Sequence, residues 1–169
     1  TDHQRFIYLI FQHTEVQFHT DNEHEKDQPD LTQQFKIGQR MDMEHFGILF
    51  REWEPYLSRG LSLIPLNQKG LVFNNPAKPH SPYGFTDTVC KTGELFMESL
   101  LFWRACRMME TLCSQYSLGN SAKYAALSGA VERSIGTLRD DGTGLYYAAS
   151  GDCRQTDIWG MAYMLYIGF

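Results

Sequence analysis

A loop at residues 81–88 combines a carboxylate with aromatic and small residues. It places Asp87 shortly after Tyr83 and Phe85. An apolar wall raises the pKa of a carboxyl group, as a general acid requires, and aromatic rings stack on the apolar faces of sugars. Asp87 is therefore a candidate general acid. The alternative is that Asp87, or Thr86, caps the helix that follows.

A second loop, residues 150–160, is denser in residues of this kind. Either of its two carboxylates could activate a water molecule, and its arginine could hold a hydroxyl group or anchor a carboxylate. The alternative is an aspartate N-cap together with an Asp–Arg ion pair. The candidate residues are Asp152, Asp157, Arg154, Gln155 and Trp159.

The histidines and cysteines form no pattern that predicts a metal site. The six histidines show no ligand spacing, and no Cys-x-x-Cys pair occurs. A glycine-rich nucleotide loop is also missing, so we expect neither a metal nor another cofactor. Arg154 would favour the thiolate of Cys153, but no histidine stands nearby in sequence to form a nucleophilic pair. We therefore expect a bystander thiol.

The four cysteines are expected to be free and buried. Cys106 and Cys113 should share one helix, where seven residues rise roughly 10 Å, beyond the reach of a disulfide. Unpaired thiols are typical of a reducing compartment, which favours a cytoplasmic location. The other two cysteines are Cys90 and Cys153.

Composition excludes several classes of protein. The chain has 169 residues, of which 43% are hydrophobic and 21% charged, so we expect one globular domain (1–169) rather than a disordered chain. A net charge of −5 is not that of a dedicated nucleic-acid binder. The uncharged run 158–169 is too short to cross a bilayer, so no membrane partner is expected. The N-terminus has neither an initiator methionine nor a signal-peptide pattern, which indicates a mature product or a fragment.

Hydrophobic spacing predicts mainly helices. Two of them, Thr92–Tyr116 and the one opened by Asp157, are apolar on most sides, whereas Ser121–Leu138 is amphipathic. This alternation suits a toroid of helical hairpins, in which inner helices line a hub and outer helices face water. The remaining expected elements are helices at His3–Phe18 (with a strand as the alternative at 6–11) and Asp42–Trp53, a further helical segment from a kink or new turn at Pro55 through Leu61, an acidic loop at 19–31 and a short strand at 71–73.

An internal repeat supports this arrangement. The segment 70–75 leads to Thr86-Asp87 and an apolar helix, and the segment 144–149 leads to Thr156-Asp157 and another apolar helix. Leu71 and Leu145 are equivalent in the two segments. The repeated unit is an aromatic strand, a turn-rich loop, Thr-Asp, an inner helix and an outer helix.

Three stretches of the chain resemble the six-hairpin glycosidase superfamily. They are residues 83–93 with 100–105, residues 149–163, and the connection from 56–61 to 71–73. The resemblance covers about residues 42–169. It implies an (α/α)6 toroid and hydrolysis of a glycosidic bond with inversion, by two acidic residues at the mouth of the toroid. Five or six helices are fewer than the twelve of a full ring, so we expect an incomplete ring with short strands in its loops.

The leading hypothesis is a glycoside hydrolase, or a catalytic-domain fragment of one, with a carbohydrate substrate. Asp87 would protonate the leaving oxygen, and Asp157 or Asp152 would activate water from the opposite face. The expected sugar contacts are stacking by Tyr83, Phe85 and Trp159, and hydroxyl binding by Arg154 and Gln155.

Two other functions stay open at the level of sequence. One is a sugar epimerase or lyase on the same toroid, since a fold does not fix a function. His80 is the histidine nearest to the first loop. The other is a non-catalytic assembly protein. In either case the apolar helices of an incomplete ring require another chain or another copy to cover them.

Overall fold

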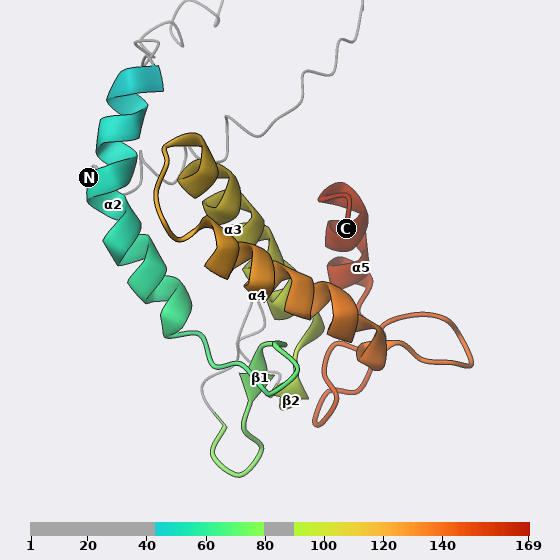
Figure 1. Cartoon of the computed structure of the whole chain (residues 1–169). Helices are drawn as coiled ribbons and strands as arrows, with labels where there is room; N and C mark the ends of the chain where they lie inside the picture. The colour runs from blue at the N-terminus through green and yellow to red at the C-terminus, as the bar shows by residue number, and fades with distance from the viewer. Residues whose placement is uncertain (1–42, 80–89) are drawn as a thin grey trace, which may run out of the picture. The chain divides into compact units, whose positions relative to one another are not determined.

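A computed structural model describes residues 43–79 and 90–169, all within one compact unit, residues 41–169 (Figure 1). The described residues are mostly helical, which confirms the expected all-α class for this part of the chain. The expected helix at 3–18 and the acidic loop at 19–31 lie outside them. The elements in chain order are α2 (Met43–Ser62), β1 (Phe73–Asn74), β2 (Gly93–Glu94), α3 (Phe96–Gln115), α4 (Ser121–Ser134), the 3₁₀ turn η2 (Ile135–Leu138) and α5 (Ile158–Tyr166).

Helix α2 is one continuous helix, whereas the sequence predicted a kink or a new turn at Pro55. Pro55 lies inside the helix and is exposed. Its missing N–H removes one helical hydrogen bond, which the rest of a 20-residue helix tolerates. The other side of α2 packs on the end of α3, where the ring centroids of Phe50 and Tyr116 are 5.9 Å apart. Arg51 Nη2 also donates to the Tyr116 carbonyl at 2.7 Å.

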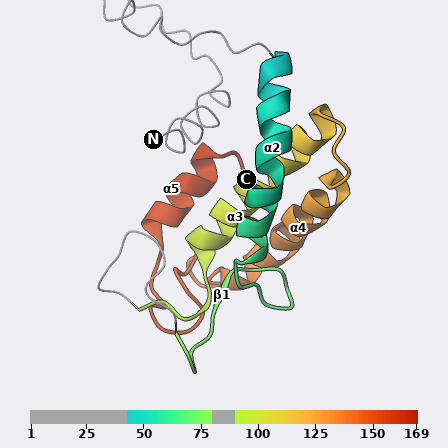
Figure 2. The same cartoon turned by 90° about the vertical axis from the view of Figure 1, so that its left-hand side faces the viewer.

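Helix α3 is the central element of the described part and contacts both α4 and α5 (Figure 2). Apolar residues on several of its sides are buried, as predicted. It begins at Phe96 rather than at Thr92, because Gly93 and Glu94 pair with β1. Its N-cap residue is Leu95, with no side-chain cap hydrogen bond from the described residues. Neither Thr86 nor Asp87 is therefore the N-cap of this helix. The buried apolar residues of α3 are Phe96, Leu100, Phe102, Trp103, Cys106, Met109 and Cys113.

Helix α4 is the amphipathic outer helix that the sequence predicted. It buries Tyr124, Ser128 and Val131 and leaves its charged residues at the surface. The predicted helix continued to Leu138, but the last four residues form η2 instead. A polar contact joins α4 to α3, because Trp103 Nε1 donates to Glu132 Oε1 at 2.8 Å.

Helix α5 begins directly after Asp157, as expected, but it is not buried on most sides. Of its residues, Gly160 alone is buried. Trp159 and Leu165 are 81% and 83% exposed. The described residues therefore cover α5 mainly on the side that faces α3.

The internal repeat is present as two matching hairpins. In the first, Gly70 N–H donates to the Asn67 carbonyl and Asn67 N–H to the Leu71 carbonyl. In the second, Gly144 N–H donates to the Asp140 carbonyl and Asp140 N–H to the Leu145 carbonyl. Both turns use a glycine with positive φ, +83° at Gly70 and +74° at Gly144, a conformation that other residues rarely adopt.

The helix that follows each hairpin is tied back to it in the same way. Leu95 N–H donates to the Val72 carbonyl, and Asp157 N–H donates to the Tyr146 carbonyl, both at 2.9 Å. Leu95 and Asp157 are the N-cap residues of α3 and α5. The predicted equivalence of Asp87 with Asp157 is therefore wrong: Asp157 matches Leu95, because the first loop is longer than the second.

All four cysteines are free, as expected, but two are not buried. Cys106 and Cys113 are buried on α3, whereas Cys90 is exposed and Cys153 is half-buried. The latter two belong to the loops before α3 and α5.

Candidate functional site

The N-terminal ends of α3 and α5 lie beside each other and form the candidate site. The loop before α5 pairs with the start of α3, since Phe96 N–H donates to the Ala148 carbonyl at 3.1 Å and Leu95 forms a bridge with Ala149. Gly160 permits the close approach of the helices, because a Cβ atom there would lie 2.7 Å from Phe96 Cδ1. The side chains at both helix starts are thus brought together.

Asp157 is the best-placed candidate carboxylate. It is 9% exposed, and its Oδ1 accepts the Gly160 N–H at 2.8 Å, so the predicted N-cap role is confirmed. Its Oδ2 is buried and has no hydrogen-bond partner among the described residues. A carboxylate can accept through both oxygens, so the acceptor capacity of Oδ2 is unused within the described residues.

Asp152 is held in a different way. The Thr92 hydroxyl donates to Asp152 Oδ2 at 2.9 Å, and the Asp152 N–H donates back to Thr92 Oγ1 at 2.8 Å. Asp152 itself is exposed. These paired hydrogen bonds fasten the second loop to the residue before β2, which is a structural task.

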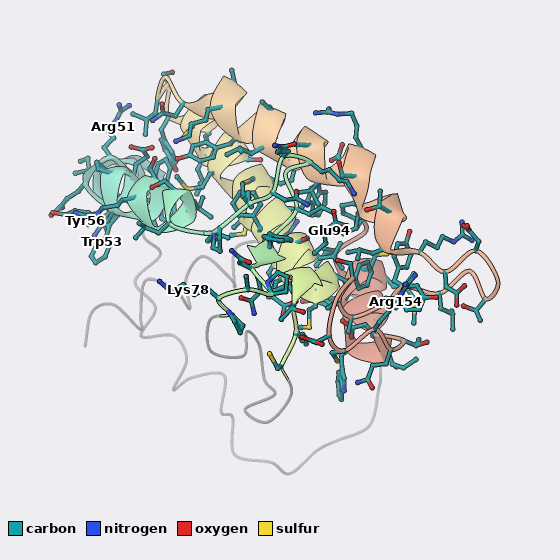
Figure 3. All side chains as sticks on the ribbon, turned by 90° about the horizontal axis from the view of Figure 1, so that it is seen from below. Arg51, Trp53, Tyr56, Lys78, Glu94 and Arg154 are labelled. Atoms are coloured by element: carbon teal, nitrogen blue, oxygen red, sulfur yellow. The ribbon has the colours of Figure 1, made fainter. Side chains whose placement is uncertain are left out.

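The other candidates of the second loop are at the surface. Arg154, labelled in Figure 3, lies 4.7 Å from the centroid of the Tyr147 ring in a cation–π contact. The alternative Asp–Arg ion pair is not formed among the described residues. Gln155 and Trp159 are exposed. The indole of Trp159 is therefore open to a flat partner such as a sugar ring. The first-loop candidates Tyr83, Phe85 and Asp87, with His80, lie outside the described residues.

Sequence reasoning missed a buried ion pair at this place. Lys91 Nζ lies 3.0 Å from Glu98 Oε1, and the two side chains are 10% and 8% exposed. Glu98 Oε2 is buried without a hydrogen-bond partner in the described part of the chain. The available signal was a carboxylate in the first turn of a helix that is apolar on most sides, together with a lysine seven residues before it.

Burial and the charges of Lys91, Asp157 and Glu98 affect the pKa of the Cys153 thiol. Burial raises the pKa of Cys153, Lys91 lowers it, and Asp157 and Glu98 raise it. The expected thiolate-favouring effect of Arg154 is therefore wrong. The backbone of Cys153 has φ of +66°, which is strained for a residue other than glycine. The structure fixes the position of Cys153 in the loop and does not favour its thiolate form.

Neither a metal site nor a membrane span is found in the residues that can be described. No group of three or more of their His, Cys, Asp and Glu side chains could hold a metal ion. None of their helices is both long enough and apolar enough to cross a bilayer. No family model, curated protein or solved structure matches the chain.

Proposed function

We propose that the chain belongs to a glycoside hydrolase that cleaves a glycosidic bond by inverting acid–base catalysis. The supporting observation is the carboxylate of Asp157, which is fixed through Oδ1 and whose Oδ2 has no hydrogen-bond partner among the described residues. A base that activates water needs a defined orientation and an acceptor oxygen that is not already hydrogen-bonded. Because Oδ2 is buried, water reaches it when the site opens for substrate.

The roles follow from that carboxylate. Asp157 takes a proton from the attacking water through Oδ2, and Asp87 protonates the leaving oxygen from the opposite face of the sugar. Inversion requires the two carboxyl groups to be roughly 6.5–9.5 Å apart. Trp159 stacks on the sugar, and Arg154 and Gln155 bind its hydroxyl groups. Asp152 is the weaker candidate base, because its Oδ2 already accepts the Thr92 hydroxyl.

The proposed fold is an incomplete (α/α)6 toroid. Its support is the repeated order of outer helix, hairpin and apolar helix, seen in α2 to α3 and again in α4 to α5. In this arrangement the loops before the apolar helices share one face, and the described candidates Asp152 and Asp157 belong to the second of these loops. A non-catalytic assembly protein is the second candidate, favoured by the exposed apolar residues of α5.

The test is the turnover of the Asp157→Asn protein on aryl glycosides and disaccharides. Asparagine caps a helix about as well as aspartate, so the free energy of unfolding should change little. Turnover should fall by roughly 10²–10⁴-fold, the usual contribution of a positioned base. Proton NMR of the first-formed anomer should show inversion.

The matched control is Asp141→Asn, which makes the same change in the exposed turn of the second hairpin and should leave turnover unchanged. Turnover at the wild-type rate in Asp157→Asn would exclude Asp157 as the base. If the wild-type protein turns over no substrate of the panel, the assembly function takes precedence.

A further inference from the structure

One face of α5 carries large apolar side chains that the described residues leave uncovered. Ile158 is 65% exposed and Leu165 is 83% exposed. Both belong to a helix whose other side packs on α3. Isolated exposed apolar residues are ordinary, but these two lie two turns apart on the same side of one helix.

The internal repeat identifies the equivalent positions on α3. Leu95 and Asp157 are matching N-cap residues, so the residues of the two helices correspond in order from the cap. The first helical residues are Phe96 and Ile158. The eighth are Trp103 and Leu165.

In α3 these same two positions are buried by the second unit of the repeat. The ring of Phe96 stacks on Tyr146 of the second hairpin, with centroids 4.5 Å apart. Trp103 meets Phe169, which follows α5, edge-on at 4.8 Å. Gly160 supplies the flat surface against Phe96. The second unit thus covers the apolar face of the helix of the first unit.

We propose that Ile158 and Leu165 are covered by a further unit of this same repeat. Its hairpin would place an aromatic residue on Ile158, as Tyr146 lies on Phe96. Its apolar helix would have a small residue at the third position, and an aromatic residue beyond its end would lie against Leu165. This inference does not depend on the proposed enzymatic function.

A second copy of this unit cannot occupy the face in the repeat geometry. The surface that it would need, formed by Gly160 and Phe169, already packs on its own α3. The α3 of a second copy is a poor substitute, because Glu98 stands where α5 has Gly160. The occupant is therefore a different helix of the same type.

Cysteine labelling in the protein expressed from its complete gene tests whether the face is covered. The variants are Leu165→Cys and, as a matched control, Leu63→Cys, whose leucine is 74% exposed just beyond α2. Peptide-resolved mass spectrometry follows maleimide at each position. Leu165→Cys should react at least about tenfold more slowly, because labelling then requires local opening of a packed contact. Ile158→Cys provides a second measurement should Leu165→Cys fold poorly.

A photo-crosslinking amino acid at position 165 identifies the occupant. We expect a crosslink to an apolar helix that directly follows a glycine-turn hairpin and lies outside residues 43–169. Equal labelling of the two cysteine variants would overturn the proposal. So would a crosslink to α5 of a second copy, or to a protein without such a hairpin.

Discussion

Four carboxylates near the two helix starts are held by different sets of partners. Asp157 accepts a backbone N–H, Asp152 a hydroxyl group, and Glu98 an ammonium group. Glu94 accepts the Asn67 side-chain amide and pairs with Lys69 on the first hairpin (Figure 3). The Asp157 and Glu98 carboxylates each keep a buried oxygen without a partner among the described residues. We therefore expect the largest single-residue effects at these two groups, on turnover at Asp157 and on the free energy of unfolding at the Lys91–Glu98 pair.

Removing one member of the buried Lys91–Glu98 ion pair should lower the free energy of unfolding far more than removing both. Lys91→Met leaves the Glu98 charge buried and unpaired, which should lower the free energy of unfolding by about 3–5 kcal/mol. The double variant Lys91→Met, Glu98→Leu should recover most of that loss. Urea denaturation measures both. The control is Arg107→Met, which breaks the exposed pair with Glu110 and should cost about 0–1 kcal/mol. A double variant no more stable than the single one would contradict the interpretation.

The cysteines should differ sharply in reactivity. Burial raises the pKa of Cys106 from 9.0 to about 12, against a smaller lowering effect of Lys123, and burial also raises the pKa of Cys113. The thiolate is the reactive form, so at pH 8 both should react at least about a hundredfold more slowly than exposed Cys90 in the native protein. Iodoacetamide labelling followed by peptide mass spectrometry measures this difference. Denaturant should abolish it, and rapid native labelling of Cys106 would show that α3 is not packed as described.

At the scale of the elements, the two hairpin glycines differ in their surroundings. Alanine at either position must adopt a positive φ, at roughly 1–2 kcal/mol. At Gly70 the new Cβ would also lie 2.7 Å from the Ala130 Cβ on α4, whereas at Gly144 its nearest neighbour is the flexible end of Arg139, 3.1 Å away. Gly70→Ala should therefore lose about 1–3 kcal/mol more than Gly144→Ala.

Urea denaturation of three variants measures this difference. The control is Gly60→Ala, which lies within α2 with nothing within 4 Å of the new Cβ and should gain about 0.5–1 kcal/mol. Equal losses at Gly70 and Gly144 would mean that the first hairpin does not pack on α4.

Helical periodicity predicted the helices well where the residues interact locally. The spacing of Tyr124 and Val131 indicated the buried side of α4, and Asp157 marked the start of α5. The start of α3 was misplaced because Gly93 and Glu94 pair with residues 73–74, and such distant pairing has no local signal. The Lys91–Glu98 pair was missed for the same reason, since its burial depends on packing between the helix starts.

At the scale of the whole molecule, apolar composition did not predict exposure. Helix α5 has no charged residue and is more apolar than α3, yet α3 lies between α4 and α5 while α5 has a neighbour on one side within the described part. The burial of a helix depends on how many neighbouring elements pack on it, and a sequence pattern does not show that number. The position of each helix in the repeat decides it instead.

Each helix start is hydrogen-bonded back to its hairpin, so the loop between these two points can change in length while the helix keeps its position. The chain has 22 residues (73–94) between the Val72 carbonyl and the Leu95 N–H. It has 10 residues (147–156) between the Tyr146 carbonyl and the Asp157 N–H. For flexible loops this difference costs only about 0.7 kcal/mol of closure entropy. Insertions can therefore lengthen one loop while the scaffold keeps its geometry. Loops from related units should be exchangeable by grafting at these two anchor points.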